Sequence, residues 1–107
     1  MNKKYKVIWS YFAESKLDEI FLYYSIHASG NIALKLISGI ISSTRNLSEN
    51  PNIGQKERLL KDRKETYRYL IFKNYKILYS VDSQQNLIKV ADVFDTRQNP
   101  KKINAKR

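Results

Sequence analysis

The feature that most constrains the fold is the stretch from Tyr67 to Val81, which holds four of the chain's eight tyrosines among aliphatic residues. A run of this composition, interrupted by Lys73-Asn74, predicts two strands joined by a tight turn. Arg68 and Lys76 lie inside it, although cations are rarely buried without a partner. The register of this hairpin therefore decides where the two charges point.

The turn allows two registers. A two-residue loop, Lys73-Asn74, would pair Phe72 with Tyr75, but such loops favour Asn-Gly or Asp-Gly because they require positive φ angles. A three-residue loop from Phe72 to Asn74 instead places Asn74 in the left-handed conformation, which asparagine tolerates. We therefore predict the three-residue loop, in which Ile71 pairs with Tyr75.

This register would give the hairpin two different faces, because side chains alternate along a strand. The predicted core face carries Tyr67, Tyr69, Ile71, Tyr75, Ile77, Tyr79 and Val81. The opposite face carries Thr66, Arg68, Leu70, Lys76, Leu78 and Ser80. One face is thus predicted to be the core, and the other to be a cationic platform that presents Arg68 and Lys76 together.

The rest of the chain predicts one earlier strand, two helices and a last strand. Residues 4–9 alternate as a strand, and a helix is expected from a capping Ser10 to about residue 27. A break is expected at residues 28–31, a second helix follows it to about Leu47, and Asn50-Pro51 ends that helix. Residues 87–95 form the last strand. The order β-α-α-β-β-β predicts an α+β fold, with a helical hairpin packed on one face of a small, mainly antiparallel sheet.

Length and charge limit the classes of protein to consider. The 107 residues predict a single domain over residues 1–107, with a frayed tail at 104–107. Neither a membrane span nor a membrane partner is expected, since no apolar run approaches the length of a transmembrane helix. The net charge of +10 implies an anionic partner. Residues 51–81 carry eight Lys or Arg against three acids, whereas residues 1–50 carry six against four.

Several kinds of chemistry have no residues to perform them. The chain has no cysteine, which excludes disulfides, thiolate nucleophiles and Cys-based zinc sites. Its one histidine, His27, is expected at the end of the first helix, away from the basic half, where the helix dipole favours it. Neither a metal nor a small-molecule cofactor is therefore expected, and the three glycines form no phosphate-binding loop.

Lysine, arginine and tyrosine are the remaining residue types that could form a binding or catalytic site. Arginine can hold a phosphate bidentately, and a lysine whose pKa is lowered by neighbouring cations could activate a 2′-hydroxyl. The candidate residues for binding nucleic acid or a target are Lys61, Arg63, Lys64, Arg68, Lys76 and Arg97. The last three are also the candidates for catalysis. Arg68 and Lys76 fit surface ion pairs equally well, and residues 61–64 fit a solvated loop.

Several segments, in order and spacing, are similar to those of a known family. They are Trp9-Ser10 with Ala13, Leu17-Asp18-Glu19-Ile20, Asn50-Pro51 with Gly54, Tyr67-Arg68-Tyr69-Leu70, Tyr75-Lys76-Ile77-Leu78-Tyr79 and Val93-Phe94-Asp95-Thr96-Arg97-Gln98-Asn99-Pro100. Over nearly its whole length the chain resembles the RelE/ParE superfamily of toxins from bacterial type II toxin–antitoxin systems. The resemblance implies a basic cytoplasmic toxin involved in growth inhibition and plasmid stabilization, which is neutralised by a cognate antitoxin.

The resemblance implies two modes of action. RelE-like members cleave mRNA on the ribosome with strand cations, an arginine after the last strand and a terminal Tyr or His. ParE-like members poison DNA gyrase by protein contact. By position Arg68, Lys76 and Arg97 look like those cations, but Leu70 replaces a further lysine and no Tyr or His follows Arg97. The resemblance thus favours gyrase; the alternatives are a metal-independent, ribosome-dependent mRNA endonuclease and a non-toxic basic nucleic-acid-binding domain. Whether the protein is an enzyme stays open.

Overall fold

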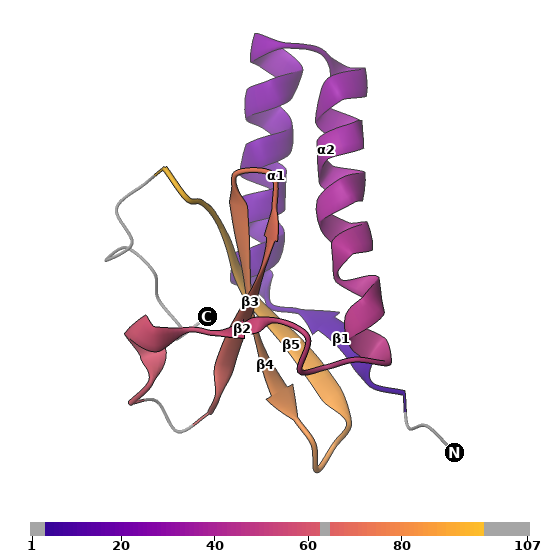
Figure 1. Cartoon of the computed structure of the whole chain (residues 1–107). Coiled ribbons are helices and arrows are strands. Elements are labelled where there is room, and N and C mark those ends of the chain that lie inside the picture. The colour runs from indigo at the N-terminus through magenta and orange to yellow at the C-terminus, as the bar shows by residue number, and fades with distance from the viewer. Residues whose placement is uncertain (1–3, 63–64, 98–107) are drawn as a thin grey trace.

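The computed structural model describes residues 4–62 and 65–97, so the predicted frayed tail lies outside the described residues. The elements, in chain order, are β1 (Lys6–Trp9), α1 (Tyr11–His27), α2 (Gly30–Ser43), the 3-10 helix η1 (Arg45–Ser48), β2 (Gln55–Lys56), the 3-10 helix η2 (Arg58–Leu60), β3 (Tyr67–Phe72), β4 (Tyr75–Asp82) and β5 (Leu87–Asp95). Helices α1 and α2 stand side by side against the sheet (Figure 1). Among the described residues, no helix has the length and apolar character needed to cross a membrane.

The five strands form one sheet in the order β1-β5-β4-β3-β2. Strand β1 runs parallel to β5, and every other neighbouring pair is antiparallel. The predicted α+β fold with its helical hairpin and mainly antiparallel sheet is confirmed, and β2 is a two-residue strand at one edge. The parallel β1–β5 pair is possible because a long connection, which includes both helices and the strands β2, β3 and β4, separates the two strands in the chain.

Both helices begin at a serine that satisfies a free backbone N–H. Ser10 Oγ accepts a hydrogen bond from the Ala13 backbone at 3.0 Å, which confirms the predicted cap, and Ser29 Oγ accepts one from Ile32 at 3.1 Å. Ser10 Oγ also donates to the Ala91 carbonyl at 3.2 Å, so the start of α1 is tied directly to β5. The second helix is shorter than predicted, because α2 ends at Ser43 and the chain continues as η1.

The core lies between the helices and one face of the sheet. Its buried residues are Ala13, Leu36, Ile40, Leu47, Tyr75, Ile77, Tyr79, Ile88, Val90 and Val93. A second, smaller cluster comprises Leu60, Tyr67, Leu78 and Ala91. Since Tyr67 and Leu78 alternate with the residues that face the helices, this cluster lies on the other side of the sheet, where η2 covers it. The sheet is therefore covered on both faces, by the helices on one and by the segment around η2 on part of the other.

The predicted three-residue turn is wrong. Phe72 pairs with Tyr75 across the two-residue loop Lys73-Asn74, and Lys73 itself takes the left-handed conformation with φ 55°. A left-handed lysine costs about 1–2 kcal/mol, but the observed register turns the Phe72 ring toward Gly39 of α2. Packing of this partly buried ring against the core offsets that cost, so contact with the helix, and not the turn preference, favours the observed register.

The corrected register exchanges the faces along β3. Tyr67, Tyr69 and Ile71, predicted to be core residues, lie on the side away from the helices together with Lys76. Arg68 pairs with Tyr79 and lies on the helix side of the sheet. The assignments along β4 are confirmed, since Tyr75, Ile77 and Tyr79 are core residues and Val81 packs against them. Arg68 and Lys76 therefore point to opposite faces, and the predicted common platform does not exist.

Candidate functional site

Lys76 is held by a buried carboxylate on the face away from the helices. Its ammonium contacts the Glu57 carboxylate, and its side chain is only 16% exposed against 5% for that of Glu57. Lys76 Nζ also lies 4.0 Å from the centroid of the Tyr69 ring, within range of a cation–π interaction. Glu57 Oε2 accepts a hydrogen bond from the Leu59 backbone at 3.2 Å. This ion pair joins the start of the η2 segment to strand β4 in the sheet. The Glu57 carboxylate thereby neutralises the charge of Lys76.

Arg68 holds a loop on the helix side of the sheet. Its Nη1 donates to the carbonyl oxygens of Gly54 at 2.8 Å and Asn52 at 3.3 Å. The neighbouring Tyr79 hydroxyl donates to the Pro51 carbonyl at 2.8 Å and accepts from the Gly54 N–H at 2.9 Å. Arg68 and Tyr79 together fasten residues 51–54, the connection from the helices to β2. Arg68 therefore has a structural role, because it holds this loop through two backbone carbonyl oxygens.

The hydroxyl of Tyr79 provides a test of this loop anchor. Burial raises the pKa of Tyr79, so the native state keeps this proton to higher pH than the unfolded chain does. The contribution of Tyr79 to stability is complete below the unfolded pKa of about 10 and is lost as pH rises above it. We expect Tyr79→Phe to lower the free energy of unfolding by about 1–2 kcal/mol at neutral pH. The variant should also lose less stability than the parent chain between neutral pH and about pH 11.

Urea denaturation at both pH values measures these effects. The matched control is Tyr11→Phe, because Tyr11 is 91% exposed and its removal should change neither quantity. Burial also raises the pKa of Tyr75, so the Tyr79 variant will keep part of the alkaline loss. An alkaline loss equal in the Tyr79 variant and in the parent chain would contradict the assignment.

Arg97 lies just after β5 and pairs with Asp95 of that strand. Its Nε donates to Asp95 Oδ1 at 2.9 Å, and its Nη2 contacts Oδ2 at 2.5 Å. These hydrogen bonds hold the pKa of the Asp95 carboxyl well below its usual range and raise the pKa of Arg97. The Arg97 side chain is nevertheless 70% exposed. It is therefore an oriented cation at the surface whose charge is largely balanced by its neighbour.

The same end of the sheet faces helix α1 across a groove of about 570 Å³, which Arg97 lines together with Tyr24, Tyr75 and His27. The Tyr24 and Tyr75 hydroxyls lie 3.5 Å apart. His27 is exposed at the end of α1, as predicted. The expectation that it lies away from the basic half is wrong, because the fold brings it into the groove of Arg97. No local sequence pattern predicts that the end of α1 lies beside the end of β5.

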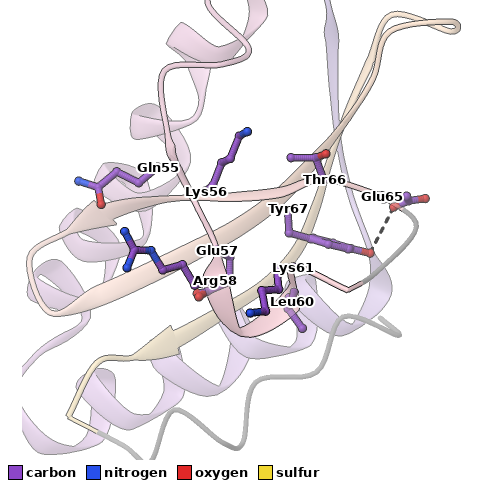
Figure 2. A pocket seen from close by; sticks show the side chains of 9 residues that line it. All are labelled: Gln55, Lys56, Glu57, Arg58, Leu60, Lys61, Glu65, Thr66 and Tyr67. Atoms are coloured by element: carbon purple, nitrogen blue, oxygen red, sulfur yellow. Dashed lines mark hydrogen bonds between the residues drawn. The ribbon is translucent and has the colours of Figure 1, made fainter.

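Lys61 lies in a different place, at a pocket beside β2 and η2. We call it the basic pocket; Figure 2 shows the nine residues that line it, Gln55, Lys56, Glu57, Arg58, Leu60, Lys61, Glu65, Thr66 and Tyr67. Its volume is about 610 Å³. The predicted residues Arg63 and Lys64 lie outside the described part of the chain. Lys56 and Arg58 were not among the predicted binding residues, although the dense charge of residues 56–65 was the signal that could have identified them.

The arrangement supports binding more readily than catalysis. Arg68 lies on one face of the sheet, Lys76 on the other, and Arg97 beyond the end of β5. Each of the three already contacts a carbonyl oxygen or a carboxylate. Within residues 4–62 and 65–97, no three His, Asp or Glu side chains gather as metal ligands would.

Comparison with known proteins gives a family and two related folds. Residues 7–100 match the model of a family described as "ParE toxin of type II toxin-antitoxin system, parDE". A chain of the chromosomal ParDE system from P. aeruginosa is similar in structure, with a TM-score of 0.71, 18% identity, and 87% of this chain and 97% of that chain covered. A chain of the toxin–antitoxin complex RelBE2 from Mycobacterium tuberculosis has a TM-score of 0.62 at 15% identity, with 89% and 97% covered. No curated protein gives a significant match.

Proposed function

The chain belongs to the ParE toxin family of type II toxin–antitoxin systems, and we propose that it inhibits growth in the cytoplasm by acting on DNA gyrase through protein contact. The proposal selects one of the two modes of action that the sequence resemblance implies. It assigns no RNA cleavage to the chain.

The observation that carries this choice is the separation of the three cations proposed for catalysis. Cleavage of a phosphodiester bond needs a phosphate-holding group and an acid or base within reach of one phosphate. Arg68 and Lys76 lie on opposite faces of the sheet, so they do not converge on a common phosphate. Glu57 also balances the charge of Lys76, so this ammonium is already engaged by a carboxylate and is not free to act on a phosphate.

We further propose that a cognate antitoxin covers the helical hairpin. The two similar structures come from systems named as toxin–antitoxin pairs. The far part of the hairpin, which extends beyond the β3–β4 turn in Figure 1, exposes Leu22 by 60%, Ile26 by 74% and Leu34 by 57%. An acidic segment with apolar anchors would match both this apolar surface and the net charge of +10. A small acidic protein encoded next to this chain is the expected partner.

A supercoiling assay with purified gyrase tests the proposed target. We expect the chain to inhibit supercoiling and to increase the amount of cleaved DNA held by gyrase, and the antitoxin to reverse both effects. The control is the same chain mixed with antitoxin before gyrase is added. If the chain neither inhibits supercoiling nor traps cleaved DNA, gyrase is not its target.

Mapping of mRNA 5′ ends after induction of the chain in cells distinguishes the ribonuclease alternative. The proposal predicts no new ends in phase with codons. New codon-phased ends would instead assign the chain to the ribosome-dependent mode. The substitution Lys76→Met then shows whether Lys76 takes part, because a catalytic lysine would be needed for the ends to appear.

A further inference from the structure

The far end of the helical hairpin carries no Lys, Arg, Asp or Glu. These residue types make up 28% of the chain, yet none occurs in residues 20–34, which form the second half of α1, the connection and the start of α2. The end of the hairpin that these residues form extends beyond the β3–β4 turn (Figure 1). We call residues 20–34 the uncharged tip. It is a surface without fixed charge on a chain whose net charge is +10.

Within the tip, α1 is apolar on two opposite sides. Ile20 and Tyr24 pack against the core. Leu22 and Ile26 are four residues apart, so they share one side of the helix, and with about 3.6 residues per turn that side points away from the core. Their side chains are 60% and 74% exposed. A helix that is apolar all round is normally buried, so the outer side of α1 is expected to have a partner.

The exposed apolar surface of the tip extends to both helices. Three further large side chains of the tip are more than half exposed: Tyr23 by 56%, Ile32 by 52% and Leu34 by 57%. Apolar side chains scattered singly over a surface need no explanation, whereas a group of them marks an interaction site. The tip holds such a group.

Charge selects the partner. An acidic segment would meet no Lys or Arg in residues 20–34, so electrostatic attraction does not favour it at the tip itself. Two copies of this chain repel each other through their basic surfaces, because each carries +10. Contact between two uncharged tips avoids close approach of those surfaces. A two-fold contact also places the same patch on both sides, and two apolar patches are complementary to each other.

From these observations we propose that the chain, when no antitoxin is bound, self-associates through the uncharged tip. In the dimer, Leu22 and Ile26 of one copy pack on the same two side chains of the other around a two-fold axis. The contact involves few side chains and is smaller than the roughly 1,600 Å² of a typical stable interface, so the dimer is weak and depends on concentration. It excludes an antitoxin from the same side chains, a consequence that rests on the antitoxin contact proposed above.

Sedimentation equilibrium of the full chain, at concentrations from about 5 to 500 µM, tests the dimer. The test variant is Leu22→Gln, Ile26→Gln. The matched control is Leu59→Gln, Ile71→Gln, because these two apolar side chains lie outside the tip and are similarly exposed, by 55% and 54%. Thermal unfolding of both variants should give the Tm of the parent chain, since all four side chains are exposed.

We expect the tip variant to raise the Kd of the dimer at least tenfold, because the two-fold contact loses four apolar side chains. The control should change the Kd by less than about threefold. Raising the salt concentration from about 50 to 500 mM should strengthen the dimer, because it screens the repulsion between the two basic copies. A contact made through ion pairs would instead weaken.

Three outcomes would overturn the proposal. The first is a parent chain that stays monomeric over the whole range of concentration. The second is an equal rise of Kd in the tip variant and in the control. The third is a monomeric chain that floats with vesicles of phosphatidylglycerol and phosphatidylcholine while the tip variant does not, which would assign the tip to a membrane surface. Gyrase inhibition is measured separately, and inhibition by a chain that stays monomeric would remove the dimer and leave the proposed function intact.

Discussion

Replacing Glu57 with alanine is expected to lower the free energy of unfolding by about 3 kcal/mol, because the substitution leaves the mostly buried Lys76 ammonium without its carboxylate. Removing one partner of a buried ion pair costs more than the pair itself contributes, since the remaining charge is desolvated and unpaired. The same substitution also removes the acceptor for the Leu59 N–H at the start of η2. Chemical denaturation of the parent chain and the variant measures the difference.

The double variant Glu57→Ala, Lys76→Met separates a specific ion pair from a general loss of packing. We expect the double variant to be more stable than the sum of the two single changes predicts, by about 2 kcal/mol, because no charge is then left buried. Lys89→Met is the control, since its partner Asp82 is 3.8 Å away and the Lys89 side chain is 41% exposed. Loss of this surface pair should change stability by less than about 1 kcal/mol. Strict additivity of the Glu57 and Lys76 changes would show that the two side chains do not interact.

The features that could be predicted from the sequence depend on neighbouring residues, and the features that could not, such as the Lys76–Glu57 ion pair, depend on residues far apart in the chain. The start of α1 at Ser10 depends on atoms three residues apart, so a local pattern was sufficient to predict it. The register of the β3–β4 hairpin depends on Phe72 packing near Gly39, and on the contact of Lys76 with Glu57. No turn preference contains those distant contacts. A difference of one residue in the loop was enough to exchange the faces of β3.

The candidate site shows the same division between local and distant information. Arg97 was identified because it follows the last strand, and it does lie at the surface in an oriented pair with Asp95. Its groove partners Tyr24 and His27 come from α1, more than half the chain away in sequence. Lys56 and Arg58 could have been named from charge density alone, but only the fold shows that they line the same pocket as Lys61 and form no ion pair within residues 4–62 and 65–97. Charge density predicts a basic surface, and tertiary structure decides which charges are available.

Replacing Gly54 with alanine is expected to lower the free energy of unfolding by about 3 kcal/mol and Tm by about 10 °C or more. A Cβ at this position would lie 2.6 Å from the Tyr69 carbonyl oxygen and 2.6 Å from the Tyr79 hydroxyl. The first of these is backbone of β3 and cannot turn away. Moving the loop to relieve the contact would break the hydrogen bond from Gly54 N–H to Tyr79 and the one from Arg68 to the Gly54 carbonyl.

The same substitution at the other two glycines gives reference values for the loss of stability expected at Gly54. A Cβ on Gly30, at the start of α2, would meet no atom within 4 Å, so Gly30→Ala should be neutral or stabilising by up to about 1 kcal/mol. A Cβ on Gly39 would meet the end of the Phe72 ring, which is only partly buried and can shift, so Gly39→Ala should cost about 1–2 kcal/mol. Thermal unfolding should therefore rank the variants Gly30, Gly39, Gly54 from most to least stable. If Gly54→Ala unfolds at the temperature of Gly30→Ala, the loop is not held against β3 as the structure shows, and the anchoring roles of Arg68 and Tyr79 fail with it.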